Sequence, residues 1–361
     1  MPGGVDDPAA PSGGNNYDRR VCRDLPQVGW QVRENTVAGD WPQPGPEARA
    51  ALAAILDDTA DGGIVLLDGL VACGVPEVIV PEAERLRLAV LVHLPLADET
   101  GLAPDRAAAL DLAERSTLQA VAAVVATSEW AAGRLVEHHG LAPSRVHVAA
   151  PGADIAPLAP GTANAASSDA PRLLCVASVT PRKGQHQLVQ ALSTVAHLPW
   201  TCVCVGGLDQ DPDYVAGLRE LIGAYGLDDR VHLVGPRTGA ALNASYAGAD
   251  LLVLASHAET YGMAVTEALA RGVPVLATAV GGVPEAVGRG PDGSVPGLLV
   301  PPDDPAALAA ALRRWLSEPG ERHRSKVIAR RRRTALAGWE ATSRSLARAL
   351  EQLRQETREA A

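Results

Sequence analysis

The sequence has 361 residues, a formal net charge of −10, 47% apolar residues and 20% charged residues. A chain of this length is expected to form two domains, each with its own hydrophobic core. No run of about 18 apolar residues occurs, so we expect no transmembrane helix. The acidic balance argues against a nucleic-acid partner. The first residues, MPGGVDDPAAPSGG, lack the basic and apolar regions of a signal peptide, so we expect a cytoplasmic protein.

The five cysteines are an odd number, and no two of them form a CxxC pair. Cys175, Cys202 and Cys204 lie in apolar runs that are typical of strands. We therefore interpret the cysteines as small apolar residues of a reducing compartment, not as metal ligands or disulfide partners.

Alternating apolar runs and helical patterns predict an α/β domain over residues 1–155. We expect strands at 31–37, 64–67, 88–94, 122–126 and 146–149, and helices at 46–56, 106–121 and 129–139. A doubly wound domain normally begins with a strand that leads into its first glycine loop. Only Met1 and Pro2 precede Gly3-Gly4 here. We therefore expect the N-terminal sheet to lack its first strand, as in a fragment or a chain whose recorded start is too late.

The segment 151–170 is rich in Pro, Gly, Ala and Ser and has no apolar periodicity, and within it we place an interdomain linker at 156–170. A second α/β domain is expected at 171–325. Its strands are predicted at 173–176, 201–205, 231–234, 251–255 and 273–278, and its helices at 185–195, 214–225, 240–247, 263–271 and 305–318. One long helix is expected from about 326 to 354, and we place residues 326–361 as a C-terminal segment that crosses back to the first domain.

Two stretches of the second domain carry candidate chemistry. Arg182 and Lys183 follow a predicted strand and precede a helix, a position suited to a diphosphate. Glu259 lies in a loop after another strand and Glu267 lies on the next helix, where carboxylates can accept hydrogen bonds from sugar hydroxyls. The alternatives are an ordinary basic surface turn and acids favoured by a helix dipole.

Other charged groups are interpreted as ordinary surface residues. Asp209, Asp211 and Asp213 alternate in a loop and are interpreted as turn acids, not metal ligands. The run 330–333 consists of four arginines. It fits a solvated helix face, and a contact with a membrane surface or a phosphate group is the alternative.

Several motifs, taken together, resemble the retaining glycosyltransferases of family 4, which have the GT-B fold. They are AETYGMAVTEALARGVPVLAT with GGVPEAV, PRKG, ADLLVLAS and PGAD, in that family's order and spacing. The resemblance covers most of the chain. It implies an α/β protein of two Rossmann-like doubly wound domains that face each other across a cleft.

The resemblance also implies roles for individual residues. Glu259, with the backbone of Thr260, Tyr261, Gly262 and Met263, would hold the donor sugar, and Glu267 would bind the ribose of the nucleotide. Arg182 and Lys183 would neutralise the diphosphate. Gly13 and Gly14 match the glycine loop of the first domain, and His93 matches a histidine that faces the donor and acceptor sugars. Ala177-Ser178 stands where many members have Gly-Arg, and Arg182 would replace that arginine.

The implied reaction is transfer of a sugar from a nucleoside-diphosphate sugar to a small-molecule, lipid-linked or glycan acceptor, with retention at the anomeric carbon. No divalent metal and no other cofactor is implied. Such a protein would be cytoplasmic, with the inner face of the membrane as a second location. The alternatives are a truncated, catalytically impaired nucleotide-binding protein, a nucleotide-sugar epimerase, and a phosphorylase, for which no lysine holding pyridoxal phosphate can be placed.

Overall fold

The computed structural model describes residues 1–9, 11–99, 101–164 and 170–359. The chain forms two compact units. Unit 1 comprises Met1–Asp7, Gly13–Gly152 and the segment from Trp339 onward, and unit 2 comprises Pro8–Ser12 and Ala153–Gly338. Part of the predicted linker, residues 165–169, lies outside the described residues.

Unit 1 contains a parallel sheet with the strand order β1-β2-β3-β4. The strands are β1 (Ile64–Asp68), β2 (Arg87–Val92), β3 (Ala123–Ala126) and β4 (Val146–Val148). β2 and β3 are apolar and buried, as expected for strands covered on both faces. The helices are α1 (Gly13–Asp24), α2 (Pro46–Asp57), α3 (Gly69–Ala72), α4 (Pro76–Glu82), α5 (Pro104–Ala120) and α6 (Glu129–His139), with 3-10 turns η1 (Leu25–Val28), η2 (Leu96–Asp98) and η3 (Pro143–Arg145).

The strand predicted at residues 31–37 is wrong. Residues 31–36 have no regular secondary structure, and Pro2 pairs with Val37 in an isolated parallel bridge. The Val37 N–H donates to the Met1 carbonyl at 3.0 Å, and the Gly3 N–H donates to the Val37 carbonyl at 2.8 Å. Val37 is buried but Val32 is exposed. The segment therefore has few apolar side chains that could pack on one face of a sheet.

Unit 2 contains a six-stranded parallel sheet with the order β10-β9-β8-β5-β6-β7. The strands are β5 (Arg172–Val176), β6 (Thr201–Val205), β7 (Val231–Leu233), β8 (Leu251–Leu254), β9 (Val275–Thr278) and β10 (Gly297–Val300). From β5 the chain adds β6 and β7 on one side, and it then returns to place β8 directly against the other side of β5. The boundary between β5 and β8 is therefore a topological switch point, where α/β sheets bind ligands beyond the carboxyl ends of their strands.

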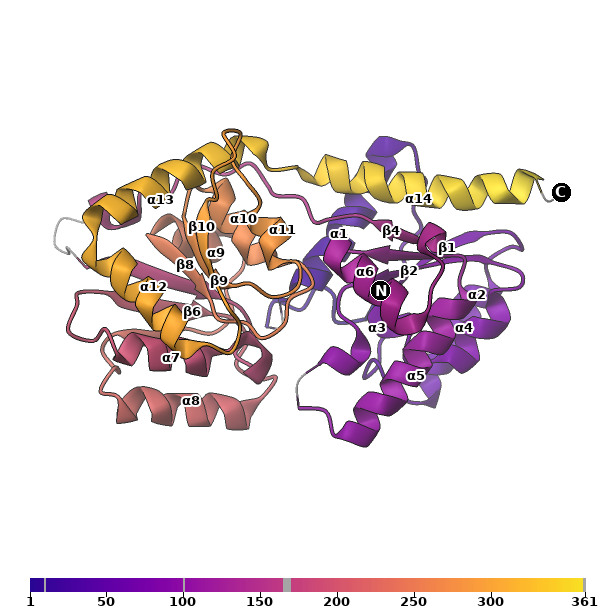
Figure 1. The fold of residues 1–361 in the computed structure, drawn as a ribbon. Helices are drawn as coiled ribbons and strands as arrows, with labels where there is room; N and C mark the ends of the chain where they lie inside the picture. The colour runs from indigo at the N-terminus through magenta and orange to yellow at the C-terminus, as the bar shows by residue number, and fades with distance from the viewer. Residues whose placement is uncertain (10, 100, 165–169, 360–361) are drawn as a thin grey trace. The chain divides into compact units, whose positions relative to one another are not determined.

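Helices cover both faces of this sheet, as in a doubly wound fold. They are α7 (Gln185–Ser193), α8 (Pro212–Ala224), α9 (Gly239–Ala247), α10 (Met263–Ala270), α11 (Val283–Val287), α12 (Pro305–Ser317) and α13 (Pro319–Arg332), with 3-10 turns η4 (Gly161–Asn164), η5 (Pro181–Lys183) and η6 (Arg333–Ala335). Figure 1 shows α7 and α8 on one side of the sheet and α10 and α13 on the other.

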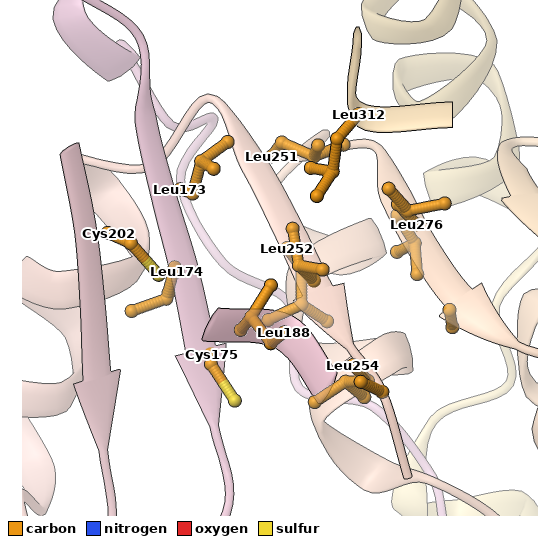
Figure 2. Packing of buried hydrophobic residues seen from close by; sticks show 14 of the residues in the cluster. Leu173, Leu174, Cys175, Leu188, Cys202, Leu251, Leu252, Leu254, Leu276 and Leu312 are labelled. Carbon is orange, nitrogen blue, oxygen red and sulfur yellow. The ribbon is translucent and has the colours of Figure 1, made fainter. Parts of the chain in front are cut away.

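Leucines from the central strands and from the covering helices form the core of unit 2. Figure 2 shows Leu188 of α7 among residues of β5 and β8, and Leu312 of α12 near Leu251. Both helix residues are fully buried. Cys175 and Cys202 lie in the same core, and the five cysteines are free thiols, of which Cys22 is half-buried and the others are buried.

The single long helix predicted near the C-terminus is wrong. α13 ends at Arg332, η6 follows, and α14 (Trp339–Glu359) begins after Gly338. α14 belongs to unit 1, where the Trp339 ring packs edge-on against Tyr17 at a centroid distance of 5.6 Å. Thr342 Oγ1 also donates a hydrogen bond to the Ala150 carbonyl at 2.8 Å.

The arginine run 330–333 makes contacts within unit 2. Arg331 pairs with Asp292 at 2.7 Å, and Arg332 donates to the Val287 carbonyl at 3.1 Å. Arg333 donates to two backbone carbonyls. These contacts fit a structural role better than a wholly solvated or membrane-facing run. Among the described residues, none of the helices combines the length and the apolar character needed to span a bilayer.

Candidate functional site

The turn after β5 packs tightly against the end of β8. Gly184 has a φ of +64°, and a Cβ at this position would lie 2.0 Å from the Ala255 carbonyl oxygen. Glycine therefore satisfies both the left-handed backbone and the close approach of the two loops. The His257 N–H donates to the Arg182 carbonyl at 2.8 Å. These contacts hold the Arg182-Lys183 turn beside the loop that carries Glu259.

Lys183 and Glu259 form a largely buried ion pair. Lys183 Nζ lies 2.6 Å from Glu259 Oε1, and the two side chains are 13% and 11% exposed. Ser256 Oγ donates to the same carboxylate oxygen at 2.9 Å. Burial alone would raise the pKa of Glu259, but the Lys183 and Arg182 charges outweigh it, so this pKa lies below its ordinary value. Glu259 is therefore an anion at neutral pH.

The loop Thr260–Gly262 leads directly into α10. Gly262 precedes the helix with a φ of +97°, and Met263 is the first helical residue. Gly282 donates its N–H to the Glu259 carbonyl at 3.0 Å, and a Cβ there would lie 2.2 Å from the Thr260 carbonyl oxygen. Tyr261 is half-buried, and burial raises the pKa of its hydroxyl. The loop is thus fixed against the start of α11. The free N–H groups of the first turn of α10 directly follow it in the chain.

Glu267 is held by α9. Its Oε2 accepts a hydrogen bond from the buried Tyr246 hydroxyl at 2.7 Å. Burial and the Glu267 charge raise the pKa of Tyr246, so the phenol keeps its proton and donates it. Arg271 packs its guanidinium over the Tyr246 ring at 4.7 Å and donates to the Glu267 carbonyl at 2.8 Å. Tyr246 is a supporting residue that the sequence alone did not indicate.

Two histidines beside the cationic turn were also not predicted. His186 at the start of α7 stacks on His257, with ring centroids 5.6 Å apart and an interplanar angle of 16°. His257 Nδ1 lies 2.6 Å from Asp303 Oδ1, and His186 Nδ1 lies 2.9 Å from the Tyr214 hydroxyl. Burial and the neighbouring His257 lower the pKa of His186. His186 lies three positions after Lys183 and His257 two positions before Glu259, and this closeness in the sequence was the available signal.

The sequence-predicted residues of unit 1 also come together. Gly13 and Gly14 open α1, and a Cβ on Gly14 would lie 3.1 Å from His93 Cδ2. His93 follows β2, and its Nε2 lies 2.8 Å from Asp18 Oδ1 of α1. Tyr17 packs edge-on against the His93 ring at 5.2 Å. Thus the glycine loop and the histidine form one group within unit 1.

Asp18 and Asp68 complete this group, and sequence reasoning missed both. Asp68 ends β1, and its Oδ1 accepts the Leu70 N–H at 2.6 Å as a helix cap. Ligand atoms of Asp18, Asp68 and His93 all lie within 4.8 Å of one another. Burial and the Asp18 charge raise the pKa of Asp68 to about 7. For His93, burial lowers the pKa but the Asp18 charge outweighs it, and the net pKa is raised.

This triad could offer three ligands to a cation. His93 and Asp18 are already hydrogen-bonded to each other, however, and Asp68 Oδ1 accepts the Leu70 N–H. We therefore interpret the group as two carboxyls and an imidazole that share protons. The position of Asp68 at a strand end and of Asp18 one turn after Gly14 were the signals in the sequence.

Comparisons with known proteins point to one enzyme class. Residues 162–332 match the model of the family described as Glycosyl transferases group 1. D-inositol 3-phosphate glycosyltransferase from Kineococcus radiotolerans is 34% identical over 264 residues, which cover 67% of this chain and 60% of that protein. The enzyme of the same name from Salinispora tropica is 33% identical over 218 residues, covering 55% and 44%. The matched region therefore spans about three fifths or less of these relatives.

Solved structures resemble the whole chain. Sucrose-phosphate synthase from Thermosynechococcus elongatus has a TM-score of 0.78 at 24% identity, covering 100% of this chain and 98% of its own. Anabaena HepE in complex with UDP and glucose has a TM-score of 0.75 at 20% identity, covering 95% and 97%. At these identities the likeness shows the fold. The chain therefore has the GT-B fold, and residues 162–332 of unit 2 are similar to the glycosyl transferases group 1 family.

Proposed function

We propose that the protein transfers a sugar from a nucleoside-diphosphate sugar to a hydroxyl-bearing acceptor, with retention at the anomeric carbon. The observation that carries this proposal is the convergence at the switch point of unit 2. The Lys183 turn after β5 and the Glu259 loop after β8 meet in a 2.6 Å ion pair at the carboxyl ends of adjacent strands. The family match of the same residues and the UDP complex of HepE support a nucleotide-sugar ligand.

The proposed chemistry follows from the charges at this edge. As the bond from the anomeric carbon to the diphosphate breaks, its electron pair passes to the phosphate oxygen, and negative charge grows there. Lys183, Arg182 and the first N–H groups of α10 stabilise that charge more in the transition state than in the ground state. The acceptor oxygen bonds to the same face of the sugar, and its proton passes to the departing phosphate oxygen.

The carboxylates have separate roles in this proposal. Glu259, ionised beside Lys183, accepts hydrogen bonds from hydroxyls of the donor sugar. Glu267, braced by Tyr246, accepts hydrogen bonds from the ribose. The fixed cations perform the electrostatic work that a divalent metal would otherwise supply, so the proposed reaction is metal-independent.

The unit 1 group is proposed to act on the sugars. Gly14 lets the start of α1 pack closely against His93, and the His93 ring is held by Asp18. The acceptor presents a hydroxyl, and D-inositol 3-phosphate is the first to test because it is named for the relatives. UDP-glucose is the first donor to test, because HepE has been solved with it.

Calorimetry of the full chain tests the first half of the proposal. UDP or GDP should bind at least tenfold more tightly than the corresponding monophosphate, because the cationic turn contacts the second phosphate. Donor sugars are then assayed for hydrolysis and for transfer with D-inositol 3-phosphate and other polyols. Equal binding of mono- and diphosphate would contradict the assigned site. Tight diphosphate binding without turnover of any donor would instead support a nucleotide-binding protein without transferase activity.

A further inference from the structure

A pocket of about 270 Å³ lies in unit 1 between η2, α5 and α6. Its lining includes Asp111 of α5 and His138 and His139, the last two residues of α6. Asp18, Asp68 and His93 do not line it. The pocket is therefore separate from the group proposed to contact the sugars.

Three side chains on the wall of this pocket present metal-type donor atoms to one another. His138 Nε2 lies 2.5 Å from Asp111 Oδ1. The His138 and His139 rings meet edge-on, with centroids 4.7 Å apart. One donor atom each of Asp111, His138 and His139 falls within a 4.8 Å cluster. Small side-chain rotations would bring two imidazole nitrogens and a carboxylate oxygen to one ion at the usual distances of about 2.0–2.2 Å.

The state of His139 is the second observation. Its side chain is only 1% exposed, and neither ring nitrogen has a hydrogen-bond partner among the described residues. Buried polar groups are normally paired, so an orphaned imidazole facing a pocket needs an explanation. A bound cation provides one, because it uses a nitrogen lone pair that no protein donor satisfies.

Glu114 supplies the outer contact that metal-binding histidines usually have. Its Oε2 lies 3.6 Å from His139 Nε2 and accepts the Leu96 N–H at 3.2 Å. Its other oxygen, Oε1, is buried without a hydrogen-bond partner among the described residues. If the ion occupies Nδ1 of His139, Nε2 carries the proton and Glu114 is the carboxylate that orients the ring.

We propose that Asp111, His138 and His139 form a binding site for a divalent transition-metal ion, with Glu114 orienting His139. Two imidazoles and one carboxylate suit Zn²⁺ and its neighbours better than Mg²⁺ or Ca²⁺, which prefer all-oxygen sites. Three protein ligands leave a fourth position open toward the pocket for water or a small anion. The ion would join α5 to α6 and stabilise unit 1 independently of sugar transfer.

The test uses the full chain stripped with EDTA and titrated with ZnCl₂ alone, followed by calorimetry. One equivalent of Zn²⁺ should bind, and His138→Gln and Asp111→Asn should each weaken binding at least about tenfold. Both replaced residues lie near the surface, so these variants are expected to fold. His197→Gln, an exposed histidine of unit 2, is the matched control and should bind as the wild type does. CoCl₂ should give a visible absorption band that His138→Gln loses.

Three outcomes would overturn the proposal. The first is the absence of a stoichiometric zinc complex in the wild type. The second is unchanged zinc affinity in both His138→Gln and Asp111→Asn, with loss in His257→Gln, which would move the ion to the His257–Asp303 pair. The third is tighter binding of MgCl₂ than of ZnCl₂, which would exclude a nitrogen-rich site.

Discussion

The carboxyl ends of the strands carry different charged groups in the two units. In unit 2 one buried cation, Lys183, meets one buried anion, Glu259, and the pair is balanced. In unit 1 two buried carboxyls, Asp18 and Asp68, share a single imidazole, His93. In the first group the Lys183 and Arg182 charges hold the pKa of Glu259 below its ordinary value, whereas in the second group burial and the Asp18 charge raise the pKa of Asp68 to about 7.

The two groups are suited to different chemical functions. A balanced ion pair beside a helix start is suited to fixed electrostatic stabilisation of a diphosphate. A crowded pair of carboxyls with one base is suited to exchanging protons with solvent or with ligand hydroxyls. Substitution of one residue in each group tests this difference.

Removal of Lys183 should have the largest effect. Lys183→Ala removes a cation from the leaving diphosphate and is expected to lower kcat for sugar transfer by about 10²–10³-fold, with a smaller change in KM. The measurement is steady-state kinetics with the donor found by screening. Lys326→Ala is the matched control, since this lysine of unit 2 also pairs with an acid, Asp250, at 3.6 Å. Similar kinetics in the two variants would show that Lys183 has no special role.

The close packing of the two loops in unit 2 can be tested through glycine. Gly226 and Gly184 have nearly the same φ, +63° and +64°, but a Cβ on Gly226 meets nothing within 4 Å. Gly226→Ala should therefore cost only the left-handed strain, about 1–2 kcal/mol. Gly184→Ala should cost more in urea unfolding and should also weaken UDP binding, because the turn must move away from Ala255. Equal unfolding free energies would contradict the close contact between the two loops.

The carboxyl pair of unit 1 should appear in the pH dependence of stability. The folded state raises the pKa of Asp68 from 3.8 to about 7, so between these values it binds more protons than the unfolded state. This group therefore makes the protein less stable as the pH rises from about 4 to about 7. Asp68→Asn, which keeps the helix cap, should flatten that decline in urea unfolding. Exposed Asp40→Asn is the control, and an unchanged slope in Asp68→Asn would argue against proton sharing.

The smallest effect is expected at Tyr246. Tyr246→Phe removes one hydrogen bond to Glu267 and should weaken nucleotide binding by roughly fivefold, equivalent to about 1 kcal/mol. The exposed Tyr225→Phe controls for loss of a phenol elsewhere. Calorimetry with UDP or GDP gives both values, and an unchanged affinity in Tyr246→Phe would show that Glu267 needs no brace.

The local parts of the fold were accessible from sequence because their signals are local. The apolar runs of β2, β3, β8 and β9 predict buried strands, and the helix predicted at 129–139 is α6. Arg182, Lys183 and Glu259 could be located near strand ends because each follows such an apolar run, β5 for the first two and β8 for Glu259. Their 2.6 Å approach depends on β5 and β8 being neighbours, which the motifs implied only through the family resemblance.

Other features depend on contacts that no local pattern contains. Asp18 and Asp68 are fifty positions apart. Nothing in the sequence around either residue shows that α1 places Asp18 beside the end of β1, where Asp68 lies. The break between α13 and α14 was missed because Arg, Ala and Leu favour helix on both sides and Gly338 is the main interruption. The segment 31–37 was predicted as a strand from alternation alone, without a neighbour for it to pair with.

The assignment of α14 to unit 1 has a consequence for how the protein is made. Residues 13–152 leave the ribosome long before Trp339 can pack on Tyr17 or Thr342 can bind the Ala150 carbonyl. Unit 2, most of whose residues are contiguous, can mature during translation, while unit 1 must wait until α14 has been synthesised. During that interval the Tyr17 ring and the Ala150 carbonyl lack the partners that α14 later supplies.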